Sequence, residues 1–433
     1  MKLFPLLALA LLAAPAAAKL DPAEQKIVRT VDSEQARTVA LLERLVNQNS
    51  GSLNLPGVEA VGAMMRSELE PLGFEVRWVP MAEVARSGHI VATHKGSGRG
   101  KRMLLIGHLD TVFEPDSPFQ RFARKDEDTA EGPGIGDDKG GMVVMVAALR
   151  AMKAAGTLEG ADIEIVLTGD EEDAGNPIAI ARRDLVAAAG RADLALDFEG
   201  LAREQGRDMG SIARRGSASW QVTAKGRTGH SSGIFSKDMG NGAIYELTRI
   251  LAAFRAELPE PNLTFNVGLI AGGATAELDR DLIRATATGK TNIIPPVAIA
   301  RGDLRALSLE QQDRVMAKMR EIVGRHLPGS SAEIAFDDGA YPPMAPTGPS
   351  RALLARLNAV NRDLGLGEMG ELDPLKRGAG DIGFVAHLIP GLVGLGTAGE
   401  GAHAPGETVD LASIPRQAKR AAILMSRLAR EKR

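Results

Sequence analysis

Histidine and carboxylate side chains stand where short apolar runs of this sequence end. The run LLIGHLDT (104–111) ends in His108 and Asp110, which point the same way because successive side chains alternate along a strand. A carboxylate beside an imidazole can take the proton of one ring nitrogen, which leaves the other nitrogen free to bind a metal ion. Taken alone, the pair favours a plainer interpretation, a buried histidine satisfied by a nearby acid.

Two further apolar runs also end in acids. ADIEIVLTGDEE (161–172) ends in Glu171 and Glu172, and ADLALDFEG (192–200) carries Glu199 near its end. Adjacent side chains diverge, so Glu172 could bind a metal ion while Glu171 stays free as a base. The alternative is a solvated acidic loop, although packed carboxylates repel each other unless a cation neutralises them.

Two glycine-rich segments carry more candidate ligands. EGPGIGDDKGG (131–141) places Asp137 and Asp138 at the start of an expected helix, and GEGAHAPGE (399–407) contains His403. An N-capping aspartate in a glycine-rich turn is the alternative for the first segment. Phosphate binding is excluded there, because the G-x-x-x-x-G-K-[ST] pattern is absent and two acids would repel a phosphate.

The composition limits which side chains could bind a metal ion and which partners the chain could have. The chain has no cysteine, which excludes disulfides, thiolate metal sites and cysteine nucleophiles, so any metal ion must be held by His, Asp and Glu. Its 52 basic and 55 acidic residues give a net charge of −3, with no basic arm or stripe. This balance argues against a nucleic-acid partner.

The first 18 residues read as a signal peptide rather than as part of the fold. Lys2 supplies a positive charge, an apolar stretch follows, and three alanines at 16–18 form a small-residue cleavage site. We therefore expect an exported chain beginning at Lys19, periplasmic or secreted, with no membrane contact after cleavage. An uncleaved membrane anchor is the alternative.

The elements that must position these residues are strands alternating with helices. Near-continuous apolar strands and a helix over 141–156 predict an α/β catalytic domain, with a mixed, mostly parallel sheet covered by helices on both faces. In such sheets ligands bind beyond the carboxyl ends of the strands, where His108, Glu172 and Glu199 stand.

The pattern changes near Arg215. A β-α-β-β-α-β order follows, which predicts an α+β, ferredoxin-like unit inserted into the larger domain. We therefore expect the larger domain in two parts, 19–215 and 330–433, with the inserted domain over 216–329.

Several motifs in a fixed order carry a resemblance to a known family. They are GHLDTV, GPGIGDDKGG, a strand-terminal EE, a strand-terminal acid about 27 residues later, and a histidine in a late glycine-rich loop. Together they resemble the M20 family of co-catalytic zinc metallopeptidases, in the branch of glutamate carboxypeptidases and related amidohydrolases. The resemblance covers essentially the whole chain after the signal peptide.

The resemblance implies a site for two zinc ions, for which Mn²⁺ or Co²⁺ could substitute. It makes Asp137 the carboxylate that bridges both ions. His108 and Glu199 would complete the protein ligands of the first ion. Glu172 and His403 would bind the second.

The remaining implied roles concern catalysis and substrate binding. Asp110 would orient His108, and Glu171 would be the general base that takes a proton from water and returns it to the leaving nitrogen. The inserted domain would be a dimerisation lid, so we expect a homodimer. His230 would stabilise the oxyanion in the partner's site, while Asn292 and Arg305 match lid positions linked to substrate binding.

The sequence departs from the family pattern in two places. Relatives that release glutamate carry an arginine just after the lid, where this chain has Asp337 and Asp338. Arg377, in the later loop KRGAGDIG, could grip a substrate α-carboxylate instead. The segment 274–290 is longer than the usual connection in the lid and has no assigned role.

Three functions are compatible with these residues. The favoured one is a zinc exopeptidase or amidohydrolase that releases a C-terminal amino acid from a peptide or an N-acyl amino acid. The second is an N-deacylase or desuccinylase, or a dipeptidase, tripeptidase or aminopeptidase of the same family. The third is a metal-free binding protein, which the intact set of five ligands disfavours.

Overall fold

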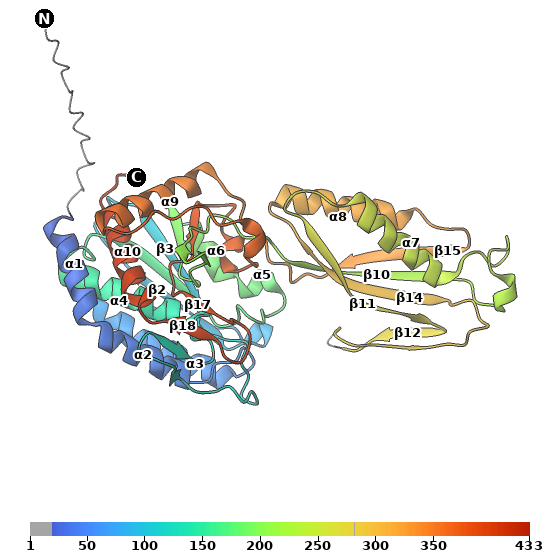
Figure 1. Ribbon diagram of the computed structural model, residues 1–433, viewed down its shortest axis with the longest axis horizontal. Helices are drawn as coiled ribbons and strands as arrows, with labels where there is room; N and C mark the ends of the chain where they lie inside the picture. The colour runs from blue at the N-terminus through green and yellow to red at the C-terminus, as the bar shows by residue number, and fades with distance from the viewer. Residues whose placement is uncertain (1–19, 281) are drawn as a thin grey trace, which may run out of the picture.

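The structure, a computed structural model, describes residues 20–280 and 282–433 of the chain. The predicted signal peptide therefore lies outside the described residues. Within them, none of the helices is long and apolar enough to cross a membrane. The chain forms two bodies side by side, a larger domain that holds both ends of the described chain and an elongated inserted domain (Figure 1).

The larger domain is built on a six-stranded sheet, which confirms the predicted mixed, mostly parallel architecture. The four strands at one side of the sheet are parallel, β2 runs antiparallel to them, and the edge strand β1 pairs antiparallel with β2. Their spatial order is β1 (Glu75–Pro80), β2 (Gly88–His94), β6 (Asp162–Thr168), β3 (Arg102–His108), β7 (Leu194–Asp197) and β16 (Gly391–Val393).

Helices cover both faces of this sheet, because its strands are apolar on both sides. Leu105 packs into one core and its neighbours Leu104 and Ile106 pack into the other. The first face carries α1 (Pro22–Ser33), α2 (Gln35–Asn47), α3 (Leu55–Leu69), α4 (Lys139–Ala155), α9 (Gly348–Asp363) and α10 (Ser413–Leu428). The second face carries the short helices α5 (Ile178–Ala181) and α6 (Arg183–Ala189), and a 3₁₀ turn at Asp381–Phe384.

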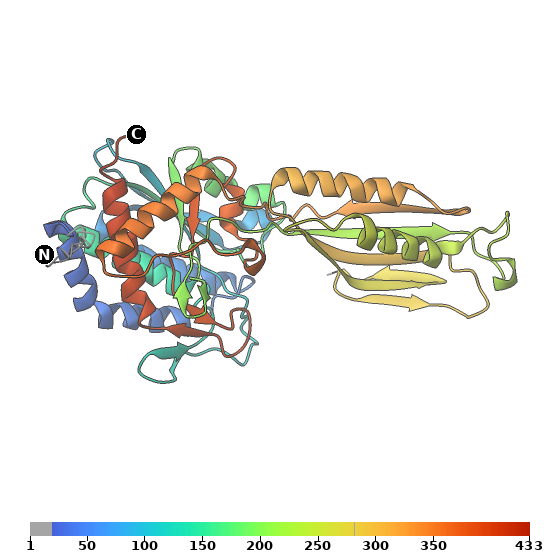
Figure 2. The same cartoon turned by 45° about the horizontal axis from the view of Figure 1, so that its top comes forward.

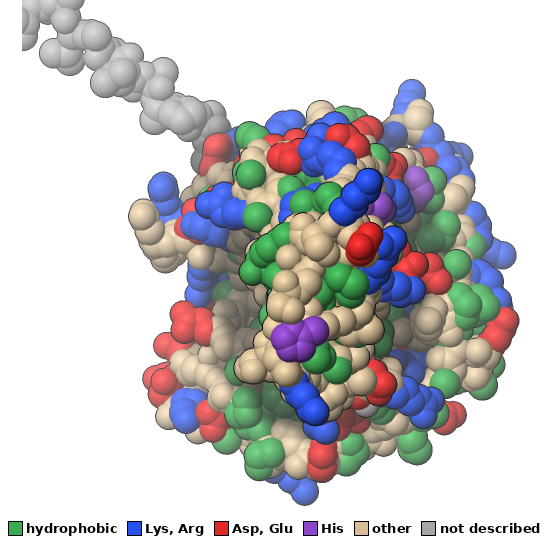
Figure 3. Space-filling view, turned by 90° about the vertical axis from the view of Figure 1, so that its right-hand side faces the viewer, with side chains coloured by type: hydrophobic (Ala, Val, Ile, Leu, Met, Phe, Trp, Pro, Cys, Tyr) green, Lys and Arg blue, Asp and Glu red, His purple; other side chains and the backbone are tan. Residues whose placement is uncertain are grey.

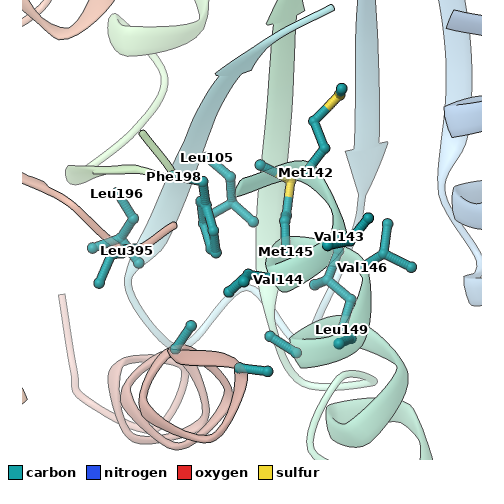
Figure 4. Close-up of a cluster of buried hydrophobic side chains, with 14 of the residues drawn as sticks. Leu105, Met142, Val143, Val144, Met145, Val146, Leu149, Leu196, Phe198 and Leu395 are labelled. Atoms are coloured by element: carbon teal, nitrogen blue, oxygen red, sulfur yellow. The ribbon is translucent and has the colours of Figure 1, made fainter. Parts of the chain in front are cut away.

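Helix α4 lies at the centre of the larger core. Fourteen of its 17 residues are buried, because α1, α2 and α10 pack around it on the sheet. Figure 4 shows Val144 and Met145 of this helix close to Leu105 and Phe198. The glycine-rich segment that carries Asp137 leads directly into α4, so this segment ends at a helix held in the core.

The inserted domain has an antiparallel four-stranded sheet with its own core. The spatial order is β11 (Thr264–Gly273), β14 (Val297–Arg305), β10 (Ala218–Gly226) and β15 (Ser330–Phe336). Helices α7 (Gly242–Glu257) and α8 (Leu309–Gly324) pack on one face (Figure 2). The predicted boundary at 329 is wrong, because β15 pairs with β10 and so belongs to the inserted domain.

The segment 274–290, which has no role in the sequence analysis, forms a separate hairpin. Its strands are β12 (Thr275–Leu278) and β13 (Ala285–Thr288), and they pair with each other beside the main sheet. The hairpin is inserted between β11 and β14, so the β-α-β-β-α-β order of the remaining elements is kept.

Two adjacent chain segments connect the domains, and we refer to this connection as the hinge. Ser217 and Tyr341 exchange two backbone hydrogen bonds of 2.8 and 2.9 Å, and Arg214 and Met344 exchange two of 2.9 and 3.0 Å. The chain therefore enters and leaves the inserted domain at one place.

Small sheets bring distant loops of the larger domain together. The first contains β17 (Gly399–Glu400), β18 (Thr408–Asp410), β5 (Thr129–Glu131) and β4 (Ala123–Arg124), in that order, and a two-stranded ribbon joins β8 (Arg203–Glu204) to β9 (Arg207–Asp208). Because β18 pairs with β5, the loop that carries His403 lies beside the segment that carries Asp137.

Candidate active site

Five side chains from separate parts of the chain converge beyond the carboxyl ends of β3, β6 and β7. They form two groups of three, in each of which one potential ligand atom per residue lies within 4.8 Å of the others. The first group is His108, Asp137 and Glu199, and the second is Asp137, Glu172 and His403. Asp137 therefore belongs to both groups.

The two oxygens of Asp137 face opposite sides of the site. Oδ1 lies 3.0 Å from His108 Nε2, and Oδ2 lies 3.2 Å from His403 Nε2. His403 Nε2 is also 3.1 Å from Glu172 Oε2. This is the arrangement required for one carboxylate to bridge two cations.

Asp110 is fully buried beneath the site and organises three of its parts. Its carboxylate accepts hydrogen bonds from the Ser52 hydroxyl at 2.6 Å and from the backbone N–H groups of Glu171 and Glu172 at 3.0 and 3.1 Å. His108 Nδ1 lies 3.1 Å from the Asp110 backbone carbonyl oxygen and 3.4 Å from its carboxylate. These contacts present Nε2 of His108 to Asp137.

Glu171 belongs to neither group of potential ligands. Burial raises the pKa of its carboxyl well above the usual range, and the nearby charge of Glu199 adds to this effect. A carboxylate in such surroundings has a higher proton affinity than one in water, which suits a general base.

The donor set fits a pair of divalent cations. Two imidazoles and three carboxylates are oxygen and nitrogen ligands of the kind that Zn²⁺ prefers when no thiolate is present. Oε1 of Glu172 is buried with no hydrogen-bond partner among the described residues. Bound cations would neutralise the packed carboxylates and give that oxygen a partner.

Zinc binding should release protons. Hydrogen bonds to Asp137 and Glu172 raise the pKa of His403 to about 11, and Asp110 and Asp137 outweigh the burial of His108 to raise its pKa as well. The raised pKa values favour the protonated form of both imidazoles before a metal ion binds, and zinc requires them neutral. We therefore expect protons to be released on binding, up to about one per imidazole, and affinity that rises with pH. Calorimetry in buffers of different ionisation enthalpy measures this number, and a value near zero would contradict the expectation.

Comparison with known proteins decides what kind of site this is. Residues 104–427 match the model of peptidase family M20/M25/M40. The chain belongs to this family. It is therefore a metal-dependent hydrolase of the peptidase and amidohydrolase type, which acts on peptides or N-acyl amino acids. The family prediction made from the motifs is confirmed.

Individual M20 relatives agree with this assignment. The chain is 29% identical to carboxypeptidase G2 of Pseudomonas sp. (strain RS-16), over 92% of this chain and 91% of that protein. It is 30% identical to succinyl-diaminopimelate desuccinylase of Acidiphilium cryptum, over 75% of this chain and 82% of that protein.

Solved structures share the fold. A tripeptidase from Staphylococcus aureus superposes with a TM-score of 0.72 at 19% identity, covering 92% of this chain and 99% of that one. A dinuclear metal-binding M20 peptidase from Bacillus subtilis gives 0.64 at 16% identity, over 92% and 99%. A dinuclear metal site is thus typical of the family.

One residue that positions the M20 site had no signal in the sequence. Glu407 is buried, and its carboxylate accepts hydrogen bonds from the backbone N–H groups of Gly134, Gly136 and Asp137 at 2.7 to 3.0 Å. Burial raises its pKa to about 7 despite these donors. Glu407 therefore holds the turn that presents Asp137.

Replacement of Glu407 by glutamine should weaken metal binding. An amide cannot accept all three N–H bonds, so Asp137 loses part of its support, and such changes behind a ligand typically cost ten- to a hundredfold in affinity. Zinc titration against a competing chelator measures the change. Wild-type affinity in a folded Glu407→Gln protein would show that the turn does not need this carboxylate.

Two of the predicted substrate residues lie near the metal site, whereas the other predicted residues of the inserted domain lie far from it. Arg377 lines a cavity together with Asp137 and Glu199, and Arg305 lies close to the same loop, near Gly378. His230 and Asn292 are neighbours in the inserted domain, where Ser231 N–H donates to the Asn292 carbonyl oxygen at 2.9 Å. Nine residues of β10 separate the hinge from that end, about 30 Å at the usual rise per residue.

Proposed function

We propose that this M20 hydrolase releases a C-terminal amino acid from peptides or N-acyl amino acids, using two zinc ions. The observation that carries the proposal is Arg377, which shares a cavity of about 110 Å³ with Asp137 and Glu199. Its Nη2 donates to the Gly200 carbonyl oxygen, and its Nε has no hydrogen-bond partner among the described residues. A guanidinium with a free donor beside the metal site suits a substrate carboxylate.

The protein groups around the proposed zinc ions have distinct tasks. Bound ions would polarise the scissile carbonyl and make a water molecule more acidic. Glu171 would accept the proton of the attacking water and pass it to the leaving nitrogen. Asp110 would keep His108 in the orientation that presents Nε2 to the ion.

The inserted domain supports a proposed homodimer. His230 and Asn292 lie too far from the metal site of their own chain to touch its substrate in this arrangement, so we propose that they act in a partner's site. Hydrophobic side chains lie among Lys and Arg on the end of the inserted domain (Figure 3). The exposed apolar residues of the domain include Phe235, Ile270 and Ile283.

The proposed setting is outside the cytoplasm. The motif at residues 1–18 supports export to the periplasm or the medium, with removal of that segment. Detection of the chain beginning at Lys19 in a periplasmic fraction tests this part.

A substrate panel tests the proposed reaction. The zinc-loaded protein is incubated with N-acyl amino acids, N-succinyl amines and dipeptides or tripeptides with free amino termini, with and without chelator. Chelator-sensitive release of C-terminal amino acids from the first group supports the proposal. A preference for N-succinyl amines would identify the protein as a desuccinylase, and a preference for free peptides would identify it as a peptidase. If it binds these ligands but neither binds zinc nor turns them over, it is a binding protein.

Replacement of Arg377 by alanine should raise KM for substrates with a free α-carboxylate. Loss of a charge-assisted pair costs about 1.5–3 kcal/mol, which corresponds to roughly a ten- to hundredfold rise. The matched control is the same substrate with its carboxylate amidated, whose KM should not change. An unchanged KM for the free acid would show that Arg377 does not grip it.

A further inference from the structure

Tyr341 connects the hinge to the backbone of Glu171. Its hydroxyl donates a hydrogen bond of 2.6 Å to the Glu171 carbonyl oxygen. Its own backbone N–H and carbonyl pair with Ser217 on the other hinge segment. The Glu171 peptide is thus held from both sides, by Asp110 through its N–H and by Tyr341 through its carbonyl.

A buried cation holds the Tyr341 hydroxyl in place. Arg182 Nη2 donates to that hydroxyl at 2.8 Å, while Nη1 and Nε donate to Asp170 and Asp381, each at 2.6 Å. The guanidinium also lies 5.7 Å from the Tyr341 ring centroid. Removing one partner from a buried charge network is strongly unfavourable, so this network fixes where Tyr341 sits relative to Glu171.

The other hinge segment makes a matching contact with a metal-ligand candidate. Arg214 is buried, and its Nη1 lies 2.7 Å from Glu199 Oε1. Its Nε donates to the Gly378 carbonyl oxygen at 2.7 Å, and its Nη2 donates to the Ala379 carbonyl oxygen. The loop that carries Arg377 and the carboxylate of Glu199 are therefore both attached to Arg214.

We propose that Tyr341 and Arg214 are positioning residues that couple the orientation of the inserted domain to the metal site. The inference rests on the proposed dinuclear site. A rotation at the hinge would move the two segments, and the contacts would transmit it to Glu171 and Glu199. A displacement of about 1 Å in a catalytic group can change turnover by roughly a hundredfold.

Hydrogen exchange on the wild-type protein tests the coupling without relying on turnover. The hinge amides of Ser217, Tyr341, Arg214 and Met344 are compared with and without saturating Zn²⁺. If the contacts couple site and hinge, zinc should slow their exchange by about tenfold or more. Equal exchange in a protein shown to bind zinc would overturn the inference.

A conservative pair of variants isolates the Tyr341 hydroxyl. The chain has two tyrosines, so Tyr341→Phe is compared with Tyr245→Phe, which makes the same chemical change on the exposed face of α7. Tyr341→Phe should keep two zinc ions and a KM within twofold, lower kcat by roughly ten- to a hundredfold, and reduce the zinc effect on the hinge amides. Tyr245→Phe should match the wild type in all three.

The outcomes separate this inference from the proposed function. Failure to bind Zn²⁺ would refute the dinuclear site. Normal zinc binding with wild-type kcat in Tyr341→Phe would refute only the coupling. If Tyr341→Phe does not fold, the zinc-dependent exchange of the wild-type hinge remains the deciding measurement.

Discussion

Replacement of Glu171 by glutamine should lower kcat by roughly a thousandfold while both metal ions stay bound. Glu171 lies outside both groups of potential ligands, so its loss does not remove a metal ligand. Glutamine keeps the shape of the side chain and the backbone contacts to Asp110 and Tyr341. What it removes is the carboxylate that exchanges a proton with water and the leaving nitrogen. Single-turnover kinetics and zinc analysis of the same sample measure both quantities.

A nearby acid provides the matched control for Glu171. Asp173 belongs to the same acidic stretch, but its side chain is 54% exposed and pairs with Arg86 at 2.8 Å. Asp173→Asn should leave kcat within about twofold, because exposed ion pairs contribute little. If Glu171→Gln keeps turnover within tenfold of the wild type, Glu171 is not the base. If the purified variant has lost its zinc, Glu171 is needed for metal binding and the case for it as the base is likewise removed.

Replacement of Asp137 by alanine should weaken the binding of both ions at once. Asp137 is the only residue shared by the two groups of potential ligands among the described residues. If each protein ligand supplies roughly a third to a quarter of a total of about 10–16 kcal/mol, affinity at each position falls by about seventyfold or more. Turnover at limiting zinc should be lost, and metal analysis after dialysis should find both sites depleted.

The adjacent residue Asp138 provides the matched control for Asp137. Asp138 is fully buried, and its Oδ2 accepts a hydrogen bond from the His108 backbone N–H at 3.3 Å. Asp138→Asn keeps that acceptor, so we expect two bound ions and near wild-type activity. Loss of only one ion from Asp137→Ala would show that the carboxylate serves a single cation rather than two.

The sequence predicted the parts of the site that follow from strand polarity. His108 is the last residue of its parallel strand, Glu172 and Glu199 follow the ends of theirs, and such ends meet at one edge of a sheet. The acids extend past the strands themselves, because β6 ends at Thr168 and β7 at Asp197. Their roles came from the ordered motifs of a family, since strand polarity brings side chains together but does not distinguish ligand from base.

The supporting residues could not be found in this way. Glu407 and Tyr341 lie in irregular segments, and neither stands at a spacing that links it to Asp137 or Glu171. Their roles depend on pairings between segments more than 100 residues apart, which no local pattern encodes. The boundary at 329 was wrong for a related reason. The sequence pattern of a short strand after a helix is the same whichever domain the strand belongs to. Only its pairing with β10 assigns β15 to the inserted domain.

The single point of entry and exit of the inserted domain also affects the order of folding. Strands β7 and β16 pair in parallel although about 190 residues separate them. If the inserted domain folds first, Ser217 and Tyr341 are already adjacent, and the effective loop shrinks to about 70 residues. The entropic contribution to the free energy of closing that loop then falls by about 0.9 kcal/mol. Early folding of the insertion would thus speed completion of the parallel sheet rather than delay it.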